Sequence, residues 1–158
     1  DNYHETNSHV LPALLSRFHL SKINKEQYVK CWGSGNARRE FMHVDDLAEA
    51  SIFALENWDP SKDNAPLDDS GEPLTWMNVG TGLDISIKEL AEMIADITTF
   101  KGKIIWDKNK PDGTFQKLLD VSRFSDLGWN SKINLSDGLR ITYKEYKKEI
   151  KNNTLRLK

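Results

Sequence analysis

Apolar residues recur along the chain with two different spacings, which indicates alternating helices and strands. Spacings of three and four predict helices over residues 10–18, 47–55, 87–97 and 135–150, and a shorter one near 123–127 that stops at Gly128. Short apolar runs predict strands over residues 28–32, 39–44, 75–79 and 103–107. This alternation favours an α/β domain.

Polar residues mark the expected beginnings of these helices. The expected caps are Asn7 or Ser8 for the first helix, Asp46 with Glu49 for the second, and Ser86 with Glu89 for the third. Pro12 is compatible with this arrangement because it falls in the first turn of its helix. Glycines at positions 33 and 35 predict a tight turn after the first strand.

The predicted sheet is too small for its most apolar elements. Because the helix after Asp46 and the strand at 75–79 are too apolar for the edge of so small a domain, we expect their remaining neighbours outside this chain. Residues 58–74 break the pattern with three prolines and five acidic residues, which predicts a solvated acidic loop or insertion. Residues 151–158 are expected to form a basic, frayed tail.

Length and composition exclude several classes of protein. The 158 residues suffice for one domain, and a balance of 22 basic against 24 acidic residues gives no basic field for nucleic acid. No run approaches the roughly 18 apolar residues of a membrane helix. The polar N-terminus has no secretory pattern, so we expect a cytoplasmic protein without a membrane partner.

Cysteine and histidine usage argues against disulfides and metal. Cys31 is the single cysteine, and it alternates with Val29 on a predicted strand, so we interpret it as a small buried hydrophobe. None of the four histidines shows the paired spacing of a zinc site. We therefore expect no metal site in this chain.

Two glycine motifs and one Tyr-Lys motif resemble cofactor sites only superficially. Gly33-Ser34-Gly35 and Gly80-Thr81-Gly82 each lack the third glycine of a dinucleotide fingerprint, so both are interpreted as tight turns. Tyr143 and Lys147 have the Tyr-x-x-x-Lys spacing of short-chain reductases. Tyr143 lies on the apolar face of the last predicted helix, which favours core packing.

Basic side chains near the glycine turns suggest a site for an anion. The cations concerned are Arg17, Arg38, Arg39, Lys108, Lys110 and Lys117. Converging from loops, they could hold a diphosphate, with Trp32 as an apolar or stacking wall. An ordinary solvated surface is the alternative. His9, near the start of the first helix, is a candidate acid or base.

Several longer blocks carry a family resemblance. They are Asn7-Ser8-His9-Val10-Leu11-Pro12-Ala13-Leu14, Trp32-Gly33-Ser34-Gly35, Arg39-Glu40-Phe41-Met42-His43-Val44-Asp45-Asp46, Asn78-Val79-Gly80-Thr81-Gly82 and Lys110-Pro111-Asp112-Gly113-Thr114. Together they resemble the GDP-L-fucose synthase family of extended short-chain dehydrogenases/reductases, in one register from about residue 1 to residue 146. The chain departs from the usual Thr-Pro-Met of the family at Asn36-Ala37-Arg38.

The resemblance implies a fold and an activity. It covers only the C-terminal half of the family, so residues 1–158 are expected to be the substrate-binding portion, with elements that complete a Rossmann domain absent from this chain. The family epimerises C3 and C5 of GDP-4-keto-6-deoxy-D-mannose and reduces the C4 ketone with NADPH, giving GDP-L-fucose. The family's glycine-rich NADP loop, its Tyr-x-x-x-Lys group and its catalytic cysteine lie upstream of the matched blocks. The complete enzyme is expected to be a homodimer, and this chain alone to be inactive.

The resemblance also implies roles for individual residues. His9 matches the acid of epimerisation, and it also lies near the nicotinamide of NADP(H). The positions that match substrate-binding residues are Arg17, Trp32, Arg39 and Asp112, with Lys117 matching a basic residue near the diphosphate. Arg39 suits this role because its planar fork can donate to two phosphate oxygens.

Two other interpretations stay open from the sequence. One is a related enzyme, such as a GDP-mannose dehydratase or a UDP-sugar epimerase, although those enzymes lack the block around His9. The other is a catalytically incompetent fragment that only binds a nucleotide sugar. A glycine-rich strand–helix unit and a Tyr-x-x-x-Lys motif upstream of residue 1 would favour the complete enzyme.

Overall fold

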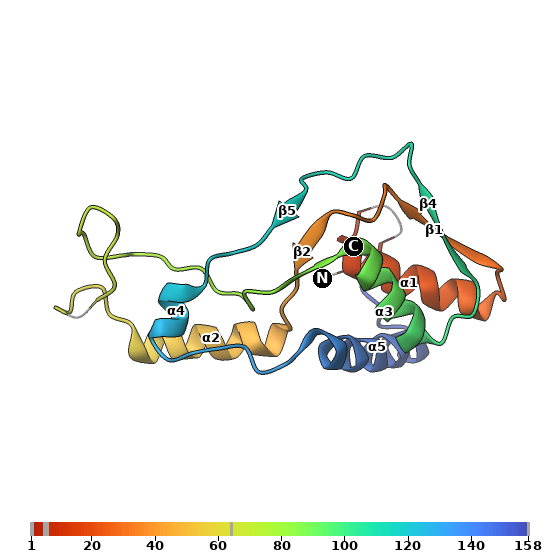
Figure 1. The fold of residues 1–158 in the computed structure, drawn as a ribbon. Helices are drawn as coiled ribbons and strands as arrows, with labels where there is room; N and C mark the ends of the chain where they lie inside the picture. Colours follow the sequence, from red (N-terminus) through yellow and green to blue (C-terminus); the bar gives the residue numbers. More distant parts are fainter. Residues whose placement is uncertain (1, 5–6, 64, 158) are drawn as a thin grey trace. The chain divides into compact units, whose positions relative to one another are not determined.

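The structure, a computed structural model, describes residues 2–4, 7–63 and 65–157 and has a mixed α/β architecture (Figure 1). The chain divides into two compact units. The first unit comprises Asp1–Arg39, Ile85–Gln116 and Ser136–Lys158. The second unit comprises Glu40–Asp84 and Lys117–Leu135.

A pair of parallel strands forms the sheet of the first unit. β1 (Tyr28–Trp32) lies beside β4 (Lys103–Asp107), in a register that pairs the first residues of the two strands and then each successive pair (Figure 1). Both strands have the predicted bounds. Val29 and Cys31 are buried while their neighbours are exposed, so the alternation of β1 sets one face toward the core.

α1 (Val10–Ile23) packs against this strand pair, and two further helices are linked to α1. α1 contacts β1 and α3 (Ile87–Thr98), and Phe18 meets Phe100 edge to face at 5.5 Å between ring centroids. α5 (Leu135–Asn152) is joined to α1 by a hydrogen bond of 3.0 Å between the Tyr146 and Ser16 hydroxyl groups. Apolar side chains at helical spacing thus bury one face of each helix, as the sequence predicts.

The helix starts follow the predictions only in part. The capping box of Ser86 and Glu89 opens α3 and is confirmed. The predicted cap of α1 is wrong: the N-cap is His9, whose extended backbone precedes the helix without a side-chain cap bond. The Ser8 hydroxyl instead donates to the His4 carbonyl at 2.7 Å, which takes it away from the helix amides.

The second unit is organised around α2 (Val44–Asn57) and α4 (Ser122–Asp126). Its core consists of Ala50, Phe124 and Trp129, with the Phe124 and Trp129 rings 5.5 Å apart. Gly128 follows α4 with φ of 106°, a conformation that favours glycine, as predicted for this stop position.

The predicted capping box at the start of α2 is wrong. The N-cap is His43, whose Nδ1 accepts a hydrogen bond from the Asp45 amide at 3.2 Å. Asp46 is buried and accepts hydrogen bonds from the amides of Lys132 and Ile133 at 3.1 and 3.0 Å. Asp46 therefore accepts hydrogen bonds from amides distant in sequence instead of capping its own helix, because buried amides need an acceptor.

The remaining strands are shorter than predicted or absent. The strand predicted over 39–44 is reduced to β2 (Arg38–Glu40), which lies between β3 (Asp84–Ser86) and β5 (Gln116–Lys117) in a three-stranded sheet. No strand forms over 75–79 within the described residues. An extended segment becomes a strand only when a neighbouring backbone pairs with it, and here Met77 and Val79 pack instead against the Ala50 core.

Apolar surface is exposed in the second unit, as the sequence predicts for α2. The exposed fractions of Val44, Leu47, Ile52 and Leu55 are 68%, 47%, 57% and 87%. Val44, Ile52 and Leu55 lie on the side of the helix away from buried Ala50. Trp76, in the segment predicted as a strand, is also exposed.

The two irregular stretches of the sequence have local order. In the acidic loop, Asp68 accepts hydrogen bonds from the amides of Ser70 and Glu72, and an isolated bridge joins Leu67 to Pro73. The expected tail is partly ordered: α5 continues to Asn152, and the Arg156 carbonyl accepts a hydrogen bond from the Tyr3 amide at 2.9 Å. Among the described residues, none of the helices combines the length and apolarity needed to cross a membrane.

Candidate functional site

Two adjoining pockets lie in the first unit. The Arg39 pocket, of about 180 Å³, is lined by Trp32, Arg39, Pro111 and Asp112, and the Arg17 pocket, of about 240 Å³, by Ser8, Leu14, Arg17 and Cys31. Both are also lined by Val10 and Ile87, and Trp32 belongs to both. Since sites for ligands of nucleotide size span roughly 300–1,000 Å³, the two pockets together have a suitable scale.

The elements of the first unit explain why these side chains meet. Trp32 is the last residue of β1, and the strand alternation that buries Cys31 directs Trp32 outward, with 60% of its surface exposed. Val10 and Ile87 are the first residues of α1 and α3. The pockets therefore lie where two helices begin, next to the exposed face of an aromatic ring.

Two arginines supply positive charge to the pockets. Arg17 donates from Nη1 to the Lys30 carbonyl at 2.9 Å, and Arg39 donates from Nη1 to the Arg38 carbonyl at 2.6 Å. Each guanidinium group is thus hydrogen-bonded to a backbone carbonyl. Since a guanidinium group has five N–H donors, each arginine has further donors for an anionic ligand.

Asp112 lines the Arg39 pocket, but its carboxylate is bound by the turn that follows β1. Oδ1 accepts a hydrogen bond from the Ser34 amide at 2.6 Å, and Oδ2 accepts one from the Ser34 hydroxyl at 2.8 Å. These bonds lower the pKa of Asp112. The resemblance implied that Asp112 binds substrate. Its hydrogen bonds to Ser34 were not predicted, because no sequence pattern indicates them.

The predicted lysines behave differently from one another. The Lys110 ammonium lies 5.3 Å from the centroid of the Trp32 ring, so a cation–π contact joins the loop after β4 to the pocket wall. Lys117 is the exposed last residue of β5, belongs to the second unit and lines neither pocket. Lys108 is exposed in the loop after β4.

His9 lies beside the pockets without lining them. It is exposed and stands between Ser8, which lines the Arg17 pocket, and Val10, which lines both. As the N-cap of α1, it is held by a helix whose first bond runs from the Ala13 amide to the His9 carbonyl at 3.0 Å. The helix thus fixes the backbone of His9 at the edge of the pocket pair.

Both glycine motifs are turns whose amides are bound by carboxylates of this chain. Asp112 occupies the turn at Gly33–Gly35, and Glu40 accepts hydrogen bonds from the amides of Thr81 and Gly82. The space at Gly80 is also taken, because a Cβ there would collide with Glu40 Oε1. Since a pyrophosphate needs such amides for itself, neither turn fits the phosphates of a dinucleotide, which confirms the interpretation as tight turns.

The Tyr-x-x-x-Lys motif is a packing feature, as predicted. Tyr143 is buried, donates to or accepts from His19 Nδ1 at 3.0 Å, and has Lys147 over its ring at 4.6 Å. Burial raises the pKa of Tyr143. A proton-donating tyrosine of a reductase needs the opposite shift, so this pair has no catalytic arrangement. Burial likewise raises the pKa of Cys31 to about 11, which makes its thiol unreactive.

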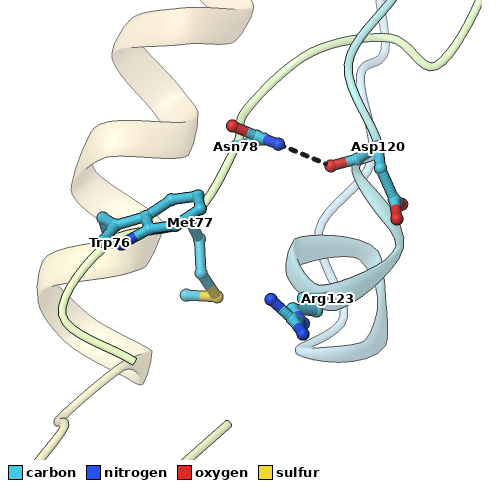
Figure 2. A pocket seen from close by; sticks show the side chains of 5 residues that line it. All are labelled: Trp76, Met77, Asn78, Asp120 and Arg123. Carbon is cyan, nitrogen blue, oxygen red and sulfur yellow. Dashed lines mark hydrogen bonds between the residues drawn. The ribbon is translucent and has the colours of Figure 1, made fainter. Parts of the chain in front are cut away.

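A third pocket lies in the second unit and is shown in Figure 2. It has a volume of about 60 Å³ and is lined by Trp76, Met77, Asn78, Asp120 and Arg123. The Asn78 side chain donates to the Asp120 carbonyl at 3.1 Å, and Arg123 forms an ion pair with Asp69 at 3.1 Å. Its size suits water rather than a nucleotide. Within the described part of the chain, no cluster of acidic, cysteine or histidine side chains could hold a metal ion.

Comparison with known proteins identifies relatives of this chain. The NAD dependent epimerase/dehydratase family matches residues 1–66. The GDP-L-fucose synthase of Escherichia coli (strain K12) is 48% identical over 143 residues, covering 90% of this chain and 43% of that protein. GDP-L-fucose synthase 1 of Arabidopsis thaliana is 46% identical over 152 residues, covering 96% of this chain and 43% of that protein.

A solved structure agrees with these matches. The GDP-mannoheptose C4 reductase from Campylobacter jejuni, with NADP bound, has a TM-score of 0.76 and 34% identity, covering 92% of this chain and 48% of that chain. The resemblance seen in the sequence and the α/β fold class are therefore confirmed. The chain spans less than half the length of the relatives it matches.

Proposed function

We propose, from the confirmed resemblance to GDP-L-fucose synthases, that this chain forms the C-terminal, GDP-sugar-binding part of such an enzyme. The activity proposed for the complete protein is 3,5-epimerisation of GDP-4-keto-6-deoxy-D-mannose and reduction of its C4 ketone to give GDP-L-fucose. The observation that carries the proposal is the meeting of Arg17, Trp32 and Arg39 around two adjoining pockets.

The arginines are proposed to bind the diphosphate. Arg39 and Arg17 each have five N–H donors, of which the backbone bonds from Nη1 use one, and a guanidinium fork matches two phosphate oxygens. Trp32 offers an exposed ring between the two pockets on which a nucleobase or sugar can pack. Lys117 is proposed to add a further positive charge near the diphosphate.

His9 is proposed as the acid of epimerisation. Removal of a proton beside the C4 ketone gives an enolate, and inversion of the carbon requires a proton donor on the opposite face from the base. An imidazole exchanges protons near neutral pH, and His9 is exposed at the edge of the pockets, at the N-cap of α1. Its imidazole would deliver the proton from Nδ1 or Nε2 to the substrate carbon.

The proposed cofactor is NADPH, which supplies the hydride for the reduction when bound. The two glycine turns of the chain do not fit its phosphates, because Asp112 and Glu40 occupy their amides. The contribution proposed for this chain is therefore limited to His9, beside the nicotinamide. We further propose a homodimer in the cytoplasm for the complete protein, to be checked by analytical ultracentrifugation and cell fractionation.

Calorimetric titration with GDP-4-keto-6-deoxy-mannose tests the binding proposal on the protein that carries this chain. We expect saturable binding that is weakened in both Arg17→Ala and Arg39→Ala, with UDP-glucose binding far more weakly. Preference for UDP-glucose would instead favour a UDP-sugar epimerase. Binding of the GDP-sugar without any NADPH-dependent turnover would favour a protein that only binds the nucleotide sugar.

A further inference from the structure

Residues 108–115 form an exposed segment, here called the strap, that follows β4 in the first unit. Both of its ends are joined to the connection between β1 and β2. The Gly33 amide donates to the Asp107 carbonyl at 3.0 Å, just before the strap, and the Arg38 amide donates to the Phe115 carbonyl at 2.7 Å. Pro111 and Asp112, in the middle of the strap, line the Arg39 pocket.

In the middle of the strap, the Asp112 carboxylate is hydrogen-bonded to that connection. Ser34 binds both carboxylate oxygens of Asp112, one through its amide at 2.6 Å and one through its hydroxyl at 2.8 Å. The same hydroxyl accepts a hydrogen bond from the Asn36 amide at 3.1 Å. Since that bond occupies a lone pair of Oγ, the hydroxyl proton is left to point at Asp112.

The turn is shaped to receive this carboxylate. Gly33 and Gly35 have φ of 76° and 82°, a conformation that suits glycine, and a Cβ on Gly33 would collide with Asp112 Oδ1. Successive amides in such a turn form a concave site for an anion. Here the anion belongs to the chain itself, so the turn and the strap are held as one wall of the pocket.

We propose that Ser34 is a positioning residue, which holds Asp112 and through it the strap so that the Arg39 pocket keeps its shape for the GDP-sugar. The part that concerns the GDP-sugar rests on the proposed function. Because Ser34 binds both oxygens of Asp112, the carboxylate ties the strap to the turn, and the proposed effect on substrate runs through the placement of the strap. Lys110 shares in this effect, because the strap carries its ammonium to the Trp32 ring.

The test compares Ser34→Ala with Ser34→Thr, which keeps the hydroxyl, in the complete protein. Ser70→Ala is the control, because it removes a serine hydroxyl but keeps the bond from the Ser70 amide to Asp68, in a turn remote in sequence from the strap. Two measurements are made: the carboxyl-¹³C pH titration of Asp112 without ligand, and kcat and KM for GDP-4-keto-6-deoxy-mannose. In Ser34→Ala the titration midpoint of Asp112 is expected to rise, because one of its hydrogen bonds is lost.

For Ser34→Ala we expect KM to rise about 3- to 10-fold, with kcat within about twofold of the wild type. The rise in KM is modest because the hydrogen bond that is lost is exposed to water. Ser34→Thr and Ser70→Ala are expected to match the wild type in both measurements. Asp112→Asn should raise KM similarly, and combining it with Ser34→Ala should add little, because the two residues act as one unit.

Unchanged titration of Asp112 in Ser34→Ala would overturn the proposal, as would additive effects of the two substitutions on KM. The titration needs no ligand, so it separates this inference from the proposed function. If the wild-type protein turned over no GDP-sugar, the proposed function would fail, and the titration would still decide whether Ser34 holds Asp112.

Discussion

The carboxylate of Glu40 binds Thr81 twice, through the Thr81 amide and, at 3.2 Å, through the Thr81 hydroxyl. The same side chain accepts hydrogen bonds from the amides of Gly82 at 2.7 Å and Leu119 at 3.0 Å. Residues 41, 42 and 79 positions further along the chain are thereby tied to the end of β2 in the second unit. Glu40 thus has a structural task in a turn whose sequence resembles a phosphate loop.

Replacing Glu40 should destabilise the second unit. In Glu40→Ala three backbone amides lose their acceptor, two of them half-buried, and we expect the free energy of unfolding to fall by about 1–3 kcal/mol. The measurement is urea unfolding followed by circular dichroism. Glu56→Ala, on an exposed position of α2, is the control and should change stability by less than about 0.5 kcal/mol. Equal stability of the two variants would contradict this account.

The sequence predicted the local parts of the fold well. β1 and β4 have the predicted bounds, and the capping box of Ser86 and Glu89 forms, because alternation and capping depend on residues close in sequence. The errors arise where residues distant in sequence determine the local structure. Asp46 has a local capping pattern but binds the amides of Lys132 and Ile133, and residues 75–79 have a strand pattern without a paired neighbour in the described chain.

The candidate site was predictable in its residue types but not in its connections. The family blocks indicated Arg17, Trp32, Arg39 and Asp112, and the structure brings these four to two adjoining pockets. The bond from Ser34 to Asp112 joins residues 78 positions apart, and no periodicity encodes such a contact. Lys117 was grouped with these residues by its place near the turn and by the resemblance, and it lines neither pocket.

Arg39 should contribute to binding of the GDP-sugar. Arg39→Ala is expected to weaken affinity by about 1.5–3 kcal/mol, the usual range for hydrogen bonds to charged groups. Arg39→Lys should restore only part of the affinity, because an ammonium cannot donate two parallel hydrogen bonds to a phosphate. Titration calorimetry measures both, with Arg140→Ala on the exposed side of α5 as a matched charge control. Wild-type affinity in Arg39→Ala would remove Arg39 from the proposed site.

His19 should make stability depend on pH. Burial, with Lys22 and Lys147 nearby, lowers the pKa of His19 below its ordinary value, and the ring contacts the Tyr143 hydroxyl and the Tyr146 ring. The unfolded chain therefore binds the proton more readily than the folded one, so stability is lost as pH falls through the ordinary histidine range near 6.5.

Urea midpoints at pH 7.5 and 5.5 measure this effect. The wild-type protein should lose stability on acidification, and His19→Phe should lose less. Lys147→Met should also lose less, because removal of a neighbouring cation makes protonation of His19 easier in the folded state. A steeper loss in Lys147→Met than in the wild type would contradict the assignment.

The 158-residue chain alone should neither oxidise NADPH with the keto sugar nor bind NADPH tightly. Its two glycine turns are occupied by Asp112 and Glu40, and Tyr143 is buried against His19. Absorbance at the NADPH wavelength, with and without the sugar, checks the first expectation, and fluorescence titration checks the second. Measurable oxidation by the purified chain would show that a cofactor site has been overlooked.

His9 should act as the proton donor of epimerisation. As the exposed N-cap of α1, it lies between Ser8 and Val10, which line the pockets, so its imidazole stands at the edge of the proposed substrate site. In the complete protein, His9→Asn should keep the fold and much of the affinity for the GDP-sugar. Its rate should fall by about 10²–10⁴-fold, the usual contribution of a positioned acid.

Isotope incorporation distinguishes this role from a structural one. In heavy water, deuterium bound to C3 and C5 of the product should appear much more slowly with His9→Asn than with the wild type, because the enolate lacks its donor on one face. Thermal unfolding of both proteins is the control for folding, and GDP-sugar titration is the control for binding. Normal incorporation by His9→Asn, or a loss of rate matched by a loss of folded protein, would assign His9 to the structure of the helix start instead.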